Sequence, residues 1–437
     1  MKIHLDLDCY FVSAERTRYP FLKGKNVVVV KSSDKHIFSH NSKKQSVMVG
    51  DTGAFNSVLE FKNNFSADHI ANAWKNEFID KDTGDIHGIV IAKSYECKKF
   101  GIKTGTHLKD AITMCNSRGE ELYIIPSDHL FYQEISIKLK QYLELKIPLL
   151  EQYSIDEFFG DLDGYVKDED TYEFIKELRD DILNKFDLPI TIGASKSKWI
   201  AKLITDRVKP FGVFALPQQY VEAYTFNIPI EEFPGIGRKI EKKLKERKID
   251  TLGKVRNVPW ILFEYGKTGV QLYNRILGID NEKVIPYHTR KGIGISRNFQ
   301  AIVSRDEVYR RVTILARYLS YTVSKLNLNP TTFYFKIRYQ YGVKNSQSIT
   351  VNRLFNEKFL LDLAKTMIAK LDNHKSYKIH YIAISASNFI TPSNLKTFDL
   401  IEYKNDTKYA SLQTQMDKLR DKYGVDTIRY ANEQLVG

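Results

Sequence analysis

The chain has 437 residues, of which 43% are hydrophobic and 27% are charged. At about 150 residues per domain this length gives roughly three domains. The composition is that of a globular protein, which excludes a small metal- or disulfide-stapled module and a globally disordered chain. Three cysteines and the lack of any long uncharged apolar window lead us to expect a soluble, cytoplasmic protein with no membrane partner and no structural zinc.

Charge is distributed unevenly along the chain. Residues 1 to 230 hold 30 Lys and Arg against 33 Asp and Glu, whereas residues 231 to 437 hold 36 against 20. The first part is therefore close to neutral and the second is strongly basic. This asymmetry favours a catalytic or structural front joined to a back that binds a polyanion, with a solvated basic surface as the alternative.

Strand and helix signals alternate over the first 216 residues. Residues 2 to 8 alternate in polarity and residues 26 to 30 form an apolar run, which predicts an edge-to-central pair of buried strands. Residues 31 to 86 are polar, with one helix expected at 66 to 80, where Ile70, Trp74 and Phe78 follow a Ser66 cap. Next we expect a strand at 88 to 92, helices from 106 and at 130 to 145, a strand at 153 to 163, a helix at 172 to 186 and a strand at 190 to 195. This order predicts an α/β or α+β front.

From about residue 217 the pattern becomes helical with short loops. Between 292 and 390, helical periods at 306 to 326 and 357 to 372 alternate with strand-like runs, which predicts a small sheet with two helices on one face. This segment carries 17 Lys and Arg against 5 Asp and Glu between His288 and Thr391. The tail from 392 is polar apart from a helix near Leu412, Met416 and Leu419.

Two acidic pairs stand in apolar, strand-like sequence. Asp6 and Asp8 are two residues apart, so their side chains share one face of a strand. Asp156 and Glu157 lie within YSIDEFF, where an unpaired carboxylate would be costly. Hard divalent cations such as Mg²⁺ bind carboxylate oxygens and leave room for phosphates. Together the pairs favour a metal site over the alternative that each caps a turn or meets a buried arginine.

Five motifs follow one another along the chain: HLDLDCYFVSAE, SYECKKFGIKTG, YSIDEFFGDLDG, GASKSKWIAKLITDRVKPFGV and FPGIGRKIEKKL. In their order and approximate spacing the chain resembles the Y-family translesion DNA polymerases, except over residues 31 to 86 and the tail. The resemblance implies an α+β multidomain fold, a right-hand polymerase with palm, fingers, helical thumb and a C-terminal little finger. It also implies template-directed, low-fidelity DNA synthesis past damaged bases by two-metal-ion nucleotidyl transfer.

The resemblance assigns the metal ligands. The family holds two metal ions on carboxylates that match Asp6, Asp156 and Glu157, and the carbonyl of Leu7 would complete the nucleotide-side metal. Asp8 is a further candidate. We expect two Mg²⁺ ions, for which Mn²⁺ can substitute, and no nucleophilic side chain, because phosphoryl transfer depends on alignment and charge neutralisation.

The resemblance also assigns nucleotide-binding residues: Tyr10, Phe11, Tyr95, Lys98 and Lys209. Tyr95, Lys98 and Lys209 match positions that touch the incoming triphosphate. Phe11 matches the aromatic residue that excludes a ribose 2′-OH, with core packing as its alternative. The family usually has arginine at the position of Lys98, and lysine offers a point charge instead of a bidentate fork.

Two groups of residues are candidates for binding DNA. Residues 233 to 244 look like a helix-hairpin-helix, in which Gly235 and Gly237 would turn backbone N–H groups toward a phosphate beside Lys239. In the basic segment, Lys336, Arg338 and Lys344 would meet backbone phosphates without reading bases.

The implied domains are the palm at 1 to 9 and 124 to 216, the fingers at 10 to 123 with an insertion at 31 to 86, the thumb at 217 to 287, the little finger at 293 to 391 and the tail at 392 to 437. Expected partners of the monomer are primer-template DNA, deoxynucleoside triphosphates and a sliding clamp, although NEQLVG is not a convincing clamp-binding peptide. Two alternatives are a palm-fold nucleotidyl cyclase, which would need no basic back, and an inactive DNA-binding adaptor, which would lack the carboxylates.

Overall fold

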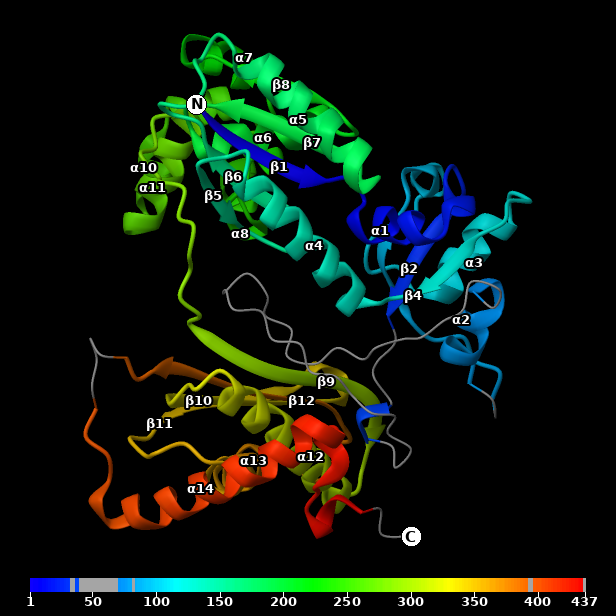
Figure 1. Cartoon of the computed structure of the whole chain (residues 1–437), viewed down its shortest axis with the longest axis vertical. Helices are drawn as coiled ribbons and strands as arrows, with labels where there is room; N and C mark the ends of the chain where they lie inside the picture. Colours follow the sequence, from blue (N-terminus) through cyan, green and yellow to red (C-terminus); the bar gives the residue numbers. More distant parts are fainter. Residues whose placement is uncertain (32–35, 39–69, 81–82, 392–395, 435–437) are drawn as a thin grey trace.

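The computed structural model describes residues 1–31, 36–38, 70–80, 83–391 and 396–434. They form a central five-stranded sheet, a small three-stranded sheet, a helical segment and a C-terminal unit built on a four-stranded sheet. In Figure 1 the C-terminal unit lies below the other parts and is joined to them by the extended stretch between α11 and β9. The expected α+β fold with several units is confirmed.

The central sheet has the strand order β5-β6-β1-β7-β8. Its strands are β1 (Lys2–Leu7), β5 (Leu149–Gln152), β6 (Glu157–Asp161), β7 (Ile190–Ser195) and β8 (Val213–Leu216). Helices α4 (His129–Glu144) and α5 (Thr171–Phe186) share one core with Ile3, Leu5 and Leu7. Helix α6 (Lys198–Val208) covers the opposite face, where a Cβ on Gly193 would lie 2.4 Å from the Ala201 carbonyl oxygen, so only glycine permits this close approach.

The small sheet has the order β3-β2-β4. Its elements are α1 (Tyr10–Arg18), β2 (Val27–Lys31), α2 (Ile70–Phe78), β3 (Ile89–Lys93), α3 (Leu108–Asn116) and β4 (Tyr123–Pro126). The predicted pairing of the strands at 2 to 8 and 26 to 30 is wrong, because β6 and β7 occupy both edges of β1. Each of the two strands is instead central in its own sheet.

The helical segment and the C-terminal unit complete the chain. The helical segment contains α7 (Val221–Thr225), α8 (Arg238–Lys245), α9 (Leu252–Arg256), α10 (Pro259–Phe263) and α11 (Gly266–Leu277). The C-terminal unit contains β9 (Gly292–Ile302), α12 (Arg305–Lys325), β10 (Pro330–Tyr339), β11 (Lys344–Thr350), α13 (Glu357–Leu371), β12 (Ile379–Phe389) and α14 (Leu400–Tyr423). Its antiparallel sheet has the order β11-β10-β12-β9, and α12 and α13 pack on one face as predicted. Among the described helices, none is both long and apolar enough to cross a membrane.

The described parts of the 31 to 86 insertion contact two different units. Phe78 of α2 is buried in the core of the small sheet, and Trp74 packs against that core, so the helix expected here is confirmed over 70 to 78. Ser66 lies outside the described residues. The short helix η2 (His36–Phe38) instead packs on the C-terminal unit, where Ile37 and Phe38 are buried.

Three arginine and aromatic contacts hold η2 in place. Arg310 donates from Nη2 to the Phe38 carbonyl oxygen at 2.9 Å. The Arg311 guanidinium lies 4.7 Å from the centre of the Phe38 ring, and the Phe38 and Phe299 rings meet edge to face at 5.9 Å. Among the described elements that precede β9, only η2 makes extensive contact with the C-terminal unit. The insertion thus links the small sheet to that unit.

Phe38→Ala is predicted to release η2 from the C-terminal unit. Removing a buried phenylalanine ring costs about 3 kcal/mol, so hydrogen exchange at residues 36 to 38 should accelerate by roughly a hundredfold. Tyr341→Ala is the control, since that ring is 86% exposed. Unchanged exchange at η2 in Phe38→Ala would contradict the packing described here.

Candidate active site

The acidic residues gather at one end of the central sheet. Strand alternation turns Ile3, Leu5 and Leu7 into the core, so His4 and Asp6 face α6. Asp6 lies opposite Glu157 in the β1–β6 register. The Leu7 N–H donates to the Asp156 carbonyl oxygen at 3.0 Å, which ties the end of β1 to the turn before β6. The structure therefore brings Asp6, Leu7, Asp156 and Glu157 together from two distant sequence segments.

Asp156 differs from the sequence expectation in its local structure. It precedes β6 and does not belong to the strand, because the Ser154 hydroxyl accepts from the N–H groups of Asp156 and Glu157 and donates to Asp156 Oδ1 at 2.6 Å. Such a local side-chain bond favours a turn over a strand. Burial raises the pKa of Asp156, and the Ser154 hydroxyl opposes this shift.

Two lysines compensate the buried charge. Lys209 Nζ lies 2.7 Å from Asp6 Oδ2, and Lys202 on α6 bonds Glu157 Oε1. Burial raises the pKa of Asp6 to about 7, Lys209 opposes this shift, and repulsion from Asp156 and Glu157 adds to it. His4 is fully buried 3.8 Å from Glu157, and burial together with Lys202 keeps its pKa well below the ordinary value, so its ring is neutral.

Asp8 is held by three donors and shares a side of the sheet with Asp6. Its carboxylate accepts from the Thr191 hydroxyl at 3.0 Å, from the Phe211 N–H at 2.7 Å and from the Tyr95 hydroxyl at 3.2 Å. Burial raises its pKa, and these donors oppose the shift. Asp8 thus fixes Tyr95 and the turn that follows Lys209 beside the carboxylates.

The nucleotide-binding candidates line the same region from the small sheet. Lys98 is exposed, and its ammonium lies 4.0 Å from the centre of the Tyr95 ring. The Phe11 ring is half-buried and stacks on Tyr132, with the ring centres 4.5 Å apart. The Tyr10 side chain is buried in the core and donates to the Tyr132 carbonyl oxygen, so any nucleotide contact of Tyr10 would involve its backbone.

The DNA-binding candidates lie on two separate surfaces. Gly235 takes a φ of 105°, which requires glycine, and Gly237 caps the start of α8, next to exposed Lys239. In the C-terminal unit, Arg338 pairs with Lys344 in the β10–β11 register, and Lys336 lies two residues before Arg338 on the same face. This face is opposite α12 and α13, since the alternate β10 residues point into the core. The structure brings the three strand residues together but places them apart from α8.

Sequence reasoning missed two residues. Lys198 and Lys202 are four residues apart on α6, and both pair with glutamates: Lys198 Nζ lies 2.6 Å from Oε2 of buried Glu151, and Lys202 pairs with half-buried Glu157. Two lysines four residues apart in a helix that covers a sheet share one face of the helix, so this spacing could have indicated acidic partners on the sheet. Glu151 also accepts from the Ile285 N–H and contacts His288, which fixes the stretch leading to β9.

Carboxylate oxygens are the donors that Mg²⁺ prefers, and two of the three acidic residues, Asp6 and Glu157, already hold ammonium groups, so the set fits a divalent ion. In the part of the chain that the structure describes, no three His, Cys, Asp or Glu side chains converge closely enough to coordinate an ion as they stand. Asp6 and Glu157 are engaged by Lys209 and Lys202 instead.

Comparison with known proteins decides the family. Residues 5–206 match the impB/mucB/samB family profile, and residues 290–400 match the profile of the C-terminal domain of the same family. The two matches together cover well over half of the chain. The chain belongs to this family, the Y family of DNA polymerases.

Individual relatives agree with this assignment. The chain is 28% identical to a DNA polymerase IV of Clostridium kluyveri over 358 residues, which cover 78% of this chain and 88% of the relative. It is 25% identical to a DNA polymerase IV of Dehalococcoides mccartyi over 434 residues, which cover 98% and 96%. A Y-family DNA polymerase chimera has the same fold, with a TM-score of 0.68 at 20% identity over 89% of this chain and 99% of the chimera.

The raised Asp6 pKa predicts how the stability of the metal-free polymerase depends on pH. The pKa of Asp6 is 3.8 in its ordinary state and about 7 in the folded protein, so the folded state binds the extra proton between these values. Protonated Asp6 therefore contributes to the free energy of unfolding. This contribution is fully present below about pH 4 and is lost as the pH rises through 7. In urea unfolding with EDTA, Asp6→Asn should therefore gain stability relative to the parent as the pH rises from 4 to 8. At pH 8, Mg²⁺ should reduce this difference, and a difference that is flat with pH would contradict the burial of the Asp6 charge.

Proposed function

We propose that this chain catalyses nucleotidyl transfer at Asp6, Asp156 and Glu157, with two Mg²⁺ ions per active site. Family membership makes it a DNA-directed DNA polymerase of the translesion and DNA-repair class, which depends on divalent metal and acts on DNA and nucleoside triphosphates. The register that sets Asp6 of β1 opposite Glu157 of β6, together with the backbone hydrogen bond from Leu7 to Asp156, is the observation that supports the proposed site. The cyclase and the inactive adaptor find no support in the comparisons.

The carboxylates and the Leu7 carbonyl would hold the metal ions. When bound, the ions would lower the pKa of the primer 3′-hydroxyl and neutralise the leaving pyrophosphate, and Mn²⁺ could substitute. Binding of cations to Asp6 would free Lys209, whose ammonium could then meet the triphosphate together with Tyr95 and Lys98. Asp8 would act as a positioning residue, since its contacts hold Tyr95 and the Phe211 backbone.

The basic surfaces would bind primer-template DNA. The turn at Gly235 and Gly237, with Lys239, would bind one backbone phosphate at the start of α8. Lys336, Arg338 and Lys344 would bind phosphates along the open face of the C-terminal sheet. Because phosphate contacts dominate, the affinity should depend strongly on salt and little on sequence.

The described units can each be assigned to one of the proposed domains. The central sheet would be the palm, the small sheet the fingers, the helical segment the thumb and the C-terminal unit the little finger. A monomeric state, a cytoplasmic location and binding to a sliding clamp belong to the same proposal, and the three free cysteines fit a reducing compartment.

Replacing Asp156 and Glu157 together by Ala is predicted to abolish primer extension. The loss should exceed a hundredfold because the metal ligands act on the chemical step, while affinity for primed DNA should stay within a few-fold because the basic surfaces are intact. Single-nucleotide extension on undamaged and abasic templates, with an anisotropy measurement of DNA affinity, gives both numbers. A double variant that keeps a tenth of the parent rate would show that these residues are not the metal ligands.

Phe11→Ala is predicted to admit ribonucleotides more readily than the parent. The half-buried ring would lie under the incoming sugar, so its removal gives a 2′-hydroxyl room without touching the carboxylates. The ratio of kcat/KM for ribonucleotide over deoxyribonucleotide should rise by about tenfold or more. Phe131→Ala is the control in the same aromatic cluster, and equal discrimination in parent and Phe11→Ala would assign Phe11 to core packing.

A further inference from the structure

Helix α14 is amphipathic, but it buries its polar side and exposes its apolar side. It begins at residue 400, where the match to the C-terminal family domain ends, and it packs on α13. The residues that it buries are polar: Asp406, Gln413, Asp417 and Arg420. Its apolar residues therefore do not hold it on the C-terminal unit.

The apolar residues of α14 form a stripe on its outer side. Tyr409, Leu412, Met416, Leu419 and Tyr423 recur at alternating steps of three and four, which places them on one face. Leu412 is 53% exposed, Leu419 48% and Tyr423 52%. Contiguous exposed apolar surface of this kind marks an interaction site.

The acidic residues and the lysines of α14 lie in different environments. All four of its acidic residues are bound to the C-terminal unit or within the helix: Glu402 and Asp406 by Arg353, Asp417 by Arg420 and Asp421 by Lys325. Its four lysines, at 404, 408, 418 and 422, are exposed, and no ion pair is found for them among the described residues. At 100° per residue, Lys404, Lys408 and Lys422 follow the outer edge of the stripe. The exposed apolar stripe thus has a basic edge.

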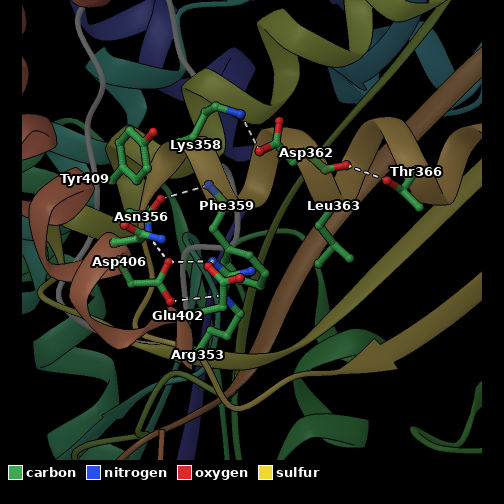
Figure 2. Close-up of a pocket in the computed structure, with 11 residues that line it drawn as sticks. Arg353, Asn356, Lys358, Phe359, Asp362, Leu363, Thr366, Glu402, Asp406 and Tyr409 are labelled. Carbon is green, nitrogen blue, oxygen red and sulfur yellow. Dashed lines mark hydrogen bonds and ion pairs between the residues drawn. The ribbon is translucent and has the colours of Figure 1, made fainter. Parts of the chain in front are cut away.

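A groove lies between α14 and α13. Its volume is about 430 Å³, and its lining is mixed: Phe359 and Leu363 of α13 and Tyr409 of α14 contribute apolar surface, and the other lining residues are polar or charged. Figure 2 shows these side chains around it, with Arg353 bridging to Asp406 at one end and Lys358 paired with Asp362 along α13.

We propose that the outer face of α14 binds an amphipathic helix of a partner protein that presents leucine-like side chains and an acidic edge. The apolar stripe would pack against the partner's apolar side chains, and the lysines would pair with its carboxylates. DNA is a poor occupant because its surface offers no apolar face to the stripe, and α13 separates α14 from the sheet that carries Lys336 and Arg338. A second copy is a poor occupant because antiparallel pairing would set one lysine edge against the other.

The test uses the full chain and two synthetic helical peptides of about 21 residues, or three heptads. Both carry leucine at steps of three and four, and their edges carry glutamate in one and lysine in the other. Fluorescence anisotropy should give about tenfold or tighter affinity for the glutamate peptide, with strong salt dependence.

Two variants with matched charge changes localise the binding. Leu412→Glu with Leu419→Glu alters the stripe, whereas Thr407→Glu with Thr414→Glu makes the same change at the same spacing on another exposed side. The stripe variant should lose about tenfold or more in affinity for the glutamate peptide and the control less than twofold. Both should extend primers at the parent rate, which also shows that they are folded.

Three outcomes would overturn the proposal. Equal affinity for the two peptides would remove the charge argument. Displacement of the glutamate peptide by single-stranded DNA, with unchanged binding in the stripe variant, would assign the lysines to nucleic acid. Self-association in analytical ultracentrifugation that the stripe variant abolishes would identify a second copy as the occupant.

Discussion

The cost of burying carboxylates at the end of β1 and β6 is the constraint on which the active site depends. The Glu157 carboxylate lies close enough to add to the raised pKa of Asp6 and of Asp156, and without cations the sheet could not hold the three carboxylates together. Lys202 within α6 and Lys209 directly after it provide those cations, so the charge balance of the site depends on the packing of α6 on the sheet. Gly193 permits that packing, because any side chain there would meet the backbone of α6.

Buried ion pairs also organise the far end of the molecule. Arg317 is bound by Glu433 and Asp426, and Arg420 by Glu357, so the last helix is joined to the C-terminal unit by charge and not by an apolar face, whereas Val425 after it also enters the apolar core. Such pairs are sensitive to geometry, since loss of one partner leaves a buried charge without compensation. This arrangement leaves the apolar side of α14 exposed, which is unusual for a helix held on a globular unit.

The insertion after β2 contacts both the small sheet and the C-terminal unit. Its α2 shares the core of the small sheet, and η2 shares the core of the C-terminal unit, so one surface segment restrains the position of the basic sheet relative to the nucleotide-binding candidates. The covalent connection between the C-terminal unit and the rest of the chain runs through residues 278 to 291. Glu151 holds this stretch on the central sheet through Ile285 and His288. The orientation of the C-terminal unit therefore depends on side-chain contacts at both places.

The sequence by itself determined the types of the elements that it predicted, the β-α-β-β-α-β order of the C-terminal unit and the acidic pairs, because each follows from local periodicity or from motifs of short range. It missed β4, β5, β8 and α6. The helices expected at 306 to 326 and 357 to 372 end within a residue of α12 and α13. Only the tertiary structure decided that β1 and β2 belong to different sheets, that Lys202 meets Glu157, that Asp8 holds Tyr95 and that η2 crosses to another unit. Each of these joins residues far apart in the chain. The direction of the α14 stripe was also beyond the sequence, because periodicity identifies an apolar face, but the ion pairs of α14 with Arg353 and Glu357 determine which face is buried.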